Sequence, residues 1–243
     1  MKMKIGLSLP SNYLSGTYTD PVSSIYYSAL GPVDSGLQLL RSEIECIELG
    51  FFMENTPAEQ IEKAVQNVWS AGLEVSVHAY LPEKIEGDDL TSIYTWLKSL
   101  LPILEDHQEK LVINLHALAS VNGNLDKLKE KTVENLKKLA DLATAQKLPV
   151  YFALELNRSK REVDPSTTYL GVLDMCLRIN SQQAGIGWDW GHAYANVLKH
   201  LLPPEPPPSF LRKVIHTHIH DLGPNGGTHW PLTCGTVPLV GLS

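Results

Sequence analysis

The chain has 243 residues, of which 43% are hydrophobic and 19% are charged, and its formal net charge is −7 at pH 7. These values predict a soluble globular protein with a single domain over residues 1–243, and the acidic balance argues against a protein whose main task is to hold duplex DNA. The three cysteines are far apart, and no segment resembles a membrane span or a signal peptide, so we expect a cytoplasmic protein without disulfides and without a membrane partner.

From the amino terminus onward, short apolar segments alternate with longer amphipathic segments, a pattern that predicts a parallel sheet with crossover helices. The expected strands are residues 5–9, 44–49, 74–79, 111–116, 150–155, 185–189 and 214–220. The expected helices are residues 33–41, 57–71, 89–104, 125–146, 166–179 and 192–202. Thr56 and Asp164 each precede a proline and are expected to cap the second and the fifth of these helices.

Strands that alternate with helices in this way predict an α/β fold of the (β/α)8 TIM-barrel type. An eighth strand and its helices would have to follow Gly235, and the sequence ends at Ser243, so we expect the last β/α unit to be missing from this sequence. An open, doubly wound sheet is the structural alternative. We prefer the barrel because the first expected strand lacks the glycine-rich turn that binds phosphates in such sheets.

Residues of the types that bind metal ions fall at the carboxyl ends of consecutive expected strands. In a β/α barrel these strand ends converge on one mouth, where the active site lies. The row consists of His78, His116, Glu155, Asp189 and His218. We therefore predict a metal site at the mouth of the barrel.

The alternation of side chains along the strands supports this convergence. Glu155 shares a strand face with Ala153, and Asp189 shares one with Gly187, whereas Trp188 points to the opposite, outer face. Two carboxylates that lie close together repel each other unless a cation is placed between them. Imidazole and carboxylate ligands suit a divalent ion such as zinc or manganese.

Other residues receive supporting roles. Trp188 and Trp230 are predicted to shape the wall of a substrate pocket, although tryptophans in such places also serve as core or rim residues. His216 lies one layer deeper than the ligand row and is predicted to hydrogen-bond to a ligand, and Glu48 either does the same or is structural. His220 is left without an assigned role.

Each of these residues, taken alone, also has a structural explanation. A single histidine at a strand end is often a hydrogen-bonded core or surface residue. Glu155 could be a solvated carboxylate at a strand end, and Asp189 could cap the helix that is expected to start near His192. The prediction of a metal site depends on the strands being taken together.

With these residues, the chain resembles the xylose-isomerase-like barrel superfamily. This superfamily includes isomerases and epimerases of sugars and sugar phosphates, and the endonuclease IV type of apurinic-site nuclease. The resemblance covers the chain from Ile5 to about Leu239. It rests on the motifs VHA at 77–79, ALELN at 153–157, DWGH at 189–192, HIHD at 218–221 and HWPL at 229–232.

The resemblance implies roles for individual residues. Glu155, Asp189 and His218 match the metal site that both branches share. His192 matches a residue that contacts substrate in the epimerases and binds a third zinc in the nuclease. Further zinc ligands of the nuclease are matched by His78, His116 and His229.

The sequence also departs from the patterns of the superfamily. Gly227 stands where the nuclease has an aspartate, and Pro224 stands where some epimerases have an arginine. Thr233, Cys234 and Gly235 replace the usual Gly-x-Gly. The glutamate of strand eight, which completes the metal site in both branches, would fall beyond Ser243.

The leading hypothesis is an enzyme of carbohydrate metabolism, a metal-dependent isomerase or epimerase that acts on a small sugar, sugar phosphate or polyol through an enediolate. Glu155 would move the proton and His192 would hold a substrate oxygen. The first alternative is a zinc-dependent apurinic-site endonuclease, the one hypothesis that requires a nucleic-acid partner. The second alternative is a barrel that binds a small ligand without catalysis. A homo-oligomer is compatible with all three.

Overall fold

The computed structural model describes residues 4–50, 56–223 and 227–230. Within these residues, seven strands follow one another in the sheet in the order of the chain, from β1 to β7. The chain forms two compact units, neither of which is continuous in the sequence. The first contains residues 1–80, 85–113 and 142–151, and the second contains residues 81–84, 114–141 and 152–243.

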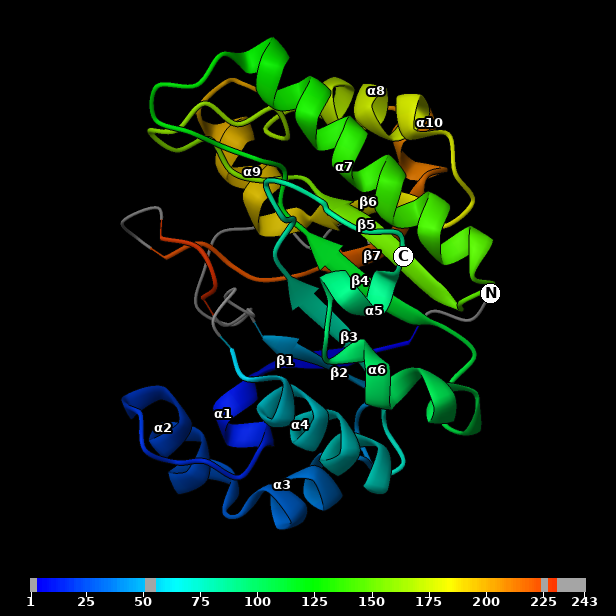
Figure 1. Ribbon diagram of the computed structural model, residues 1–243. Helices are drawn as coiled ribbons and strands as arrows, with labels where there is room; N and C mark the ends of the chain where they lie inside the picture. Colours follow the sequence, from blue (N-terminus) through cyan, green and yellow to red (C-terminus); the bar gives the residue numbers. More distant parts are fainter. Residues whose placement is uncertain (1–3, 51–55, 224–226, 231–243) are drawn as a thin grey trace. The chain divides into compact units, whose positions relative to one another are not determined.

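The first compact unit is built on three parallel strands, whose helices α1, α3 and α4 lie together on one side of β1 and β2 (Figure 1). Its strands are β1 (Gly6–Pro10), β2 (Cys46–Gly50) and β3 (Glu74–Ala79). Its helices are α1 (Ser11–Leu14), α2 (Pro21–Leu30), α3 (Val33–Leu40), α4 (Ala58–Ser70), α5 (Leu90–Ile93), α6 (Leu97–Leu100) and η1 (Leu101–Asp106), the last a 3-10 helix. Helix α4 buries Ile61, Val65 and Val68, whose spacing of three and four residues places them on one helical face.

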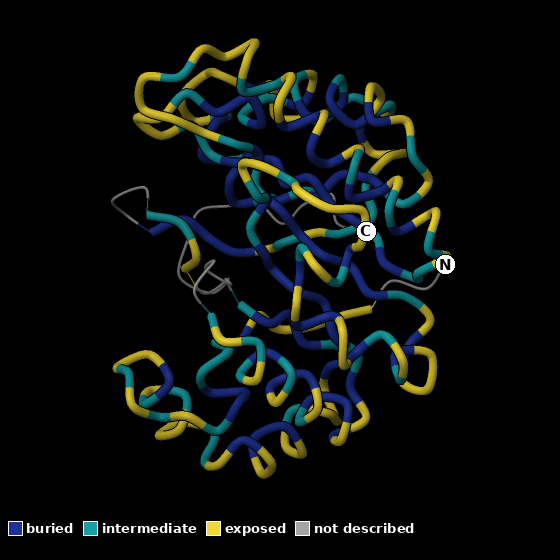
Figure 2. Tube along the Cα trace, in the orientation of Figure 1, coloured by how far each residue is buried: buried dark blue, intermediate teal, exposed yellow. Residues whose placement is uncertain are grey.

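The second compact unit contains the remaining strands and helices. Strands β4 (Leu111–Leu115) and β5 (Val150–Glu155) and helix α7 (Leu125–Ala145) belong to it in part. It is completed by α8 (Tyr169–Ile179), β6 (Ala184–Asp189), α9 (Trp190–Leu198), α10 (Pro208–Leu211) and β7 (Val214–His218). Helix α8 buries Val172, Met175 and Ile179, and strands β5 and β6 are mostly buried, as the dark blue trace of Figure 2 indicates for much of this unit.

The pairing of β6 with β7 contains a β-bulge. Ile186 lies opposite Val214, but the next residue, Gly187, lies opposite His216, so that Ile215 is the extra residue. The shift then places His218 opposite Asp189. A one-residue change of register turns every following side chain to the other face of a strand. The bulge therefore determines that the histidines of β7 share the face of Asp189.

The predicted strands are confirmed in number and order, and residues 74–79 and 150–155 match their predicted bounds. The prediction of one helix over residues 89–104 was wrong, because the chain forms α5, α6 and η1 there. Tyr94 leaves the helical conformation and is buried, and its hydroxyl donates a hydrogen bond to the carbonyl of Tyr80 at 2.8 Å. Helices α1, α2 and α10 were not predicted. Of these, α2 had a sequence signal, since Asp20 caps its amino end and Pro21 is its first residue.

Two predicted helix caps were also wrong. Pro57, not Thr56, precedes the first residue of α4, and no side chain caps that end. Helix α8 is capped by Thr168, whose hydroxyl accepts the backbone N–H of Gly171 at 3.0 Å. Asp164 instead closes a turn by accepting the backbone N–H of Ser166 at 2.8 Å. No helix in the described part of the chain combines the length and the hydrophobicity that a bilayer crossing requires.

Candidate metal centre

Glu155, the last residue of β5, is almost completely buried, with 1% of its surface exposed. The side-chain amide of Asn114 donates a hydrogen bond to its Oε2, and Nε2 of His116 lies 3.3 Å from its Oε1. Gly187 lies opposite Glu155 on β6, and a Cβ atom there would come within 2.4 Å of Oδ1 of Asn114. The glycine thus leaves the room that Asn114 needs to hold the carboxylate.

Asp189 ends β6 and is fully buried. Its Oδ1 accepts the backbone N–H of His192 at 2.6 Å, so it caps the amino end of α9. Nδ1 of His218 lies 3.6 Å from Oδ2 of Asp189 and 3.4 Å from Oε2 of Glu155. The pairing of β6 with β7 beyond the bulge therefore places the imidazole of His218 close to both carboxylates.

His192 provides the test of whether a cation fits between these carboxylates. Its Nδ1 lies 3.2 Å from Oε1 of Glu155 and 3.3 Å from Oδ2 of Asp189, yet this buried atom has no partner with hydrogen-bond geometry. Ligand atoms of the three residues all lie within 4.8 Å of one another. One imidazole nitrogen without a hydrogen-bond partner and two carboxylates form the kind of donor set that binds a divalent metal ion, so these residues fit such an ion.

Both carboxylates are held in the ionised form. Burial raises the pKa of Glu155, but the contacts with His116, His192 and His218 outweigh it and lower the pKa well below its ordinary value. Burial likewise raises the pKa of Asp189, but the contacts with His218 and His220 outweigh this effect and lower the pKa below its ordinary value. The imidazoles therefore keep the pair charged and able to bind a cation.

His216 contacts the ligand row from one layer deeper, as its position on β7 predicts. Its Nε2 lies 3.2 Å from Nε2 of His218. If His218 presents the lone pair of Nδ1 to a cation, its proton is on Nε2 and is donated to His216. Such a partner fixes the tautomer and the orientation of a ligand histidine. The role of His216 stays a prediction.

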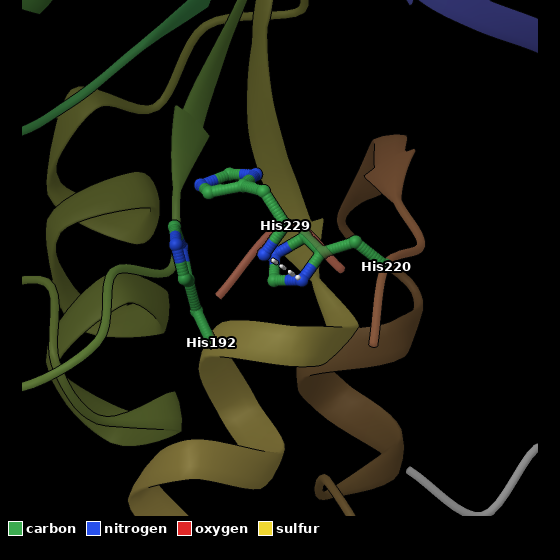
Figure 3. Close-up of side chains that lie close together, drawn as sticks. All are labelled: His192, His220 and His229. Carbon is green, nitrogen blue, oxygen red and sulfur yellow. Dashed lines mark hydrogen bonds between the residues drawn. The ribbon is translucent and has the colours of Figure 1, made fainter. Parts of the chain in front are cut away.

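His192, His220 and His229 form a second group of imidazoles (Figure 3). Of these, His192 and His220 also contact Asp189. The ring centres of His192 and His220 are 5.3 Å apart, and those of His220 and His229 are 4.3 Å apart. Burial and the neighbouring imidazoles of His220 and His192 lower the pKa of His229 to about 4. His229 is therefore neutral at physiological pH, the form in which histidine binds metals.

Four other residues were predicted to belong to the site or to support it, namely Glu48, His78, Trp188 and Trp230. Glu48 and His78 belong to the first compact unit, where Nδ1 of His78 lies 3.9 Å from Oε1 of Glu48, and their assignment to the metal centre stays a prediction. The structure does not bring Trp188 to the carboxylates, because its ring stacks on Trp190 and meets the edge of Phe210. Trp230 is 41% exposed, and its ring lies against Gly223.

The residues that support the carboxylates were not predicted from the sequence. Asn114 was given no role at the site, and its completely buried side chain holds Glu155. His220 had no role, and its Nε2 lies 3.0 Å from Oδ1 of Asp189. The one available signal was the density of histidines in and directly after β7, and that pattern does not say which ring contacts which carboxylate.

We expect the stabilising contribution of His116 and His220 to the metal-free protein to be lost as the pH rises from about 6 to about 8. Burial alone would lower the pKa of His116, but the hydrogen bond to Glu155 and its negative charge raise it above its ordinary value. Asp189 raises the pKa of His220 in the same way against the effect of burial. A raised pKa in the folded state stabilises the protein fully below the unfolded value of about 6.5, and this contribution is lost as the pH rises through the raised value.

Urea unfolding in the presence of a chelator, at several pH values in this window, measures the effect. The variant in which both His116 and His220 are replaced by Gln should lose the decline that the wild-type protein shows. The quantity compared is the free energy of unfolding of the wild-type protein minus that of the variant. If this difference is as large at pH 8 as at pH 6, the prediction is contradicted.

The comparisons with known proteins place the chain in a family by its sequence. A family model described as xylose isomerase-like TIM barrel matches residues 38–242. This match and the seven strands confirm both the predicted resemblance and the predicted TIM-barrel fold class. No curated protein matches the chain in a sequence search.

Solved structures with the same fold include a dehydratase and sugar epimerases. The probable 3-DHS dehydratase AsbF from Bacillus anthracis has a TM-score of 0.57 and 14% identity, over 96% of this chain and 86% of that chain. D-psicose 3-epimerase from Clostridium cellulolyticum H10, solved with D-tagatose, has a TM-score of 0.57 and 15% identity, over 97% and 78%. D-allulose 3-epimerase from Methylomonas sp., in complex with D-allulose, has a TM-score of 0.53 and 16% identity, over 96% and 76%.

Proposed function

Because this chain belongs to the xylose isomerase-like TIM barrel family, we propose that it is a divalent-metal-dependent isomerase or epimerase acting on a small sugar, sugar phosphate or polyol. One observation carries the proposal. The buried carboxylates of Glu155 and Asp189 share the imidazoles of His192 and His218, and Nδ1 of His192 faces them without a hydrogen-bond partner. The likeness to sugar epimerases supports the choice of substrate class.

The reaction would pass through an enediolate formed by loss of a proton from carbon. A bound divalent ion would supply positive charge that stabilises the developing negative charge on oxygen. Glu155 is ionised, so its carboxylate is ready to take the proton. Asn114 holds Oε2 of Glu155 and thereby orients the base. His192 would use its second ring nitrogen to hold a substrate oxygen.

Hydrogen exchange in D2O tests this proposal more generally than a search for one product. The protein is loaded with manganese or zinc and incubated with D-tagatose, D-allulose or their phosphates, and incorporation of deuterium at carbon is followed by NMR. We expect exchange at the carbon next to the carbonyl, and none after removal of the metal by a chelator. Absence of exchange for the whole set of ketoses by metal-loaded protein would contradict the proposal.

An apurinic-site endonuclease is the second candidate, and the group of His192, His220 and His229 favours it because additional imidazoles suit additional zinc ions. Elemental analysis separates the candidates. One zinc or manganese per chain supports the isomerase, two or three zinc ions support the nuclease, and no metal supports a ligand-binding barrel. Incubation of the metal-loaded protein with an abasic-site duplex then tests the nuclease directly, and no nicking at high protein concentration rejects it.

A further inference from the structure

The imidazole of His220 contacts Asp189, and both of its ring nitrogens are engaged. Nε2 lies 3.0 Å from Oδ1 and 3.1 Å from Oδ2 of Asp189. Nδ1 accepts the backbone N–H of His229 at 3.0 Å, the dashed line in Figure 3, and lies 3.2 Å from the carbonyl oxygen of Asp221. In the neutral ring, Nδ1 accepts and Nε2 carries the hydrogen. In the charged ring, both nitrogens carry one. Nε2 therefore donates to Asp189 in either state.

The surrounding backbone is shaped to hold this ring. Gly191, in the first turn of α9, leaves the space, since a Cβ atom there would come within 2.1 Å of Cε1 of His220. His229 adopts a left-handed backbone conformation with φ of +66°, which few non-glycine residues adopt. The segment around it is fixed by a pair of backbone hydrogen bonds between Asp221 and Trp230, at 2.8 and 3.1 Å. The backbone that surrounds the His220 ring thus comes from three separate parts of the second compact unit.

These contacts decide between two roles for His220. A ligand of an additional metal ion, together with His192 and His229, would need a free lone pair on one ring nitrogen. The lone pair of Nδ1 already accepts the N–H of His229, and Nε2 donates to Asp189. A residue that donates to a carboxylate ligand fixes the orientation of that ligand without binding the ion itself.

We propose that His220 is a positioning residue that holds the Asp189 carboxylate in the orientation needed to bind the cation. This inference rests on the metal centre of the proposed function and goes beyond it by assigning a residue outside the ligand set. Partners of this kind typically contribute about 10- to 100-fold to metal affinity. The hydrogen bond from the N–H of His229 to Nδ1 of His220 orients the ring so that Nε2 donates to Asp189.

Calorimetric titration of the metal-free protein with zinc, and separately with manganese, measures this contribution. We expect H220A to bind one equivalent, as the wild-type protein does, with an affinity lower by about 10- to 100-fold. H220Q, whose amide nitrogen can replace Nε2 as a donor, should restore most of the affinity, and H220N, whose shorter side chain replaces Nδ1, should not. H200N is the matched control, because His200 is exposed and asparagine tolerates its left-handed backbone.

A second variant disturbs the packing around the His220 ring without removing the ring. G191A places a methyl group against His220 while the helix itself accepts alanine readily. We expect G191A to weaken metal binding in the wild-type background and to have no further effect in H220A, a non-additivity that a merely structural role would not produce. Nitrogen-15 NMR of the histidine rings should also find a hydrogen on Nε2 of His220 in the metal-free protein.

Three results would overturn the inference. These are an unchanged affinity of H220A, equal rescue by H220N and H220Q, and the loss of one equivalent of metal in H220A, which would make His220 a ligand of an additional ion. A wild-type protein that binds no metal would instead contradict the proposed function. In that case a ring hydrogen on Nδ1 alone would contradict the geometry of His220 as well.

Discussion

The substitution Glu155→Gln is expected to lower metal-dependent turnover by about 10³-fold or more while the protein keeps its fold. Glutamine has the shape of glutamate, so the buried side chain still fills its place against Asn114 and Gly187. It carries no negative charge and has no basicity, so it neither takes a proton nor balances a cation. Removal of a general base alone typically costs about 10²- to 10⁴-fold, and the loss of a metal ligand adds to it.

The measurement is the rate of deuterium incorporation at saturating metal, with circular dichroism and thermal unfolding as checks of the fold. Glu162→Gln is the matched control, because it makes the same chemical change at an exposed residue seven positions further along the chain. If Glu155→Gln retains turnover within about tenfold of the wild-type rate, Glu155 is not the base.

The second large effect concerns Asp189, which combines two roles that a pair of substitutions can separate. Its Oδ1 caps α9 by accepting the N–H of His192, and its carboxylate faces Nδ1 of the same residue. Asparagine caps helices about as well as aspartate but carries no charge. We therefore expect Asp189→Asn to weaken metal binding by more than about 100-fold, beyond the effect of an outer-sphere partner.

Asp189→Ala removes the cap as well as the charge. Relative to Asp189→Asn, it should lower the free energy of unfolding of the metal-free protein by about 0.5–2 kcal/mol, the usual contribution of a cap. Urea unfolding of both variants in chelator, together with their zinc affinities, gives the two quantities. Wild-type zinc affinity in Asp189→Asn would show that this aspartate is a helix cap and nothing more.

The sequence contained enough information for the order of the strands and for the two carboxylates. Alternation of apolar and amphipathic segments does not depend on tertiary contacts, and the strands 74–79 and 150–155 were therefore predicted with their bounds. Segment 89–104 has the composition of a helix, but the buried hydroxyl of Tyr94 finds its partner in the carbonyl of Tyr80, a contact between separate segments. Such contacts override local propensity and are not encoded in a short window of sequence.

The site was predictable as a set of residue types and only partly as an arrangement. Glu155 and Asp189 follow from the alternation along β5 and β6. The face of His218 does not, because Ile215 is an extra residue in β7 and the count along the strand alone would place Thr217 opposite Asp189. The partner of His220 depends on Gly191, whose significance is the absence of a side chain. Neither a bulge nor an empty space has a signature in a single sequence.

Glu155, Asp189, His192 and His218 all come from one compact unit, the part of the chain that also holds His220 and His229. A cation that binds the folded form of this unit stabilises it by mass action and makes its local opening rarer. Proteases that cut transiently opened segments would then find β5, β6 and β7 less often. The supply of metal would in this way govern the lifetime of the protein as well as its chemistry.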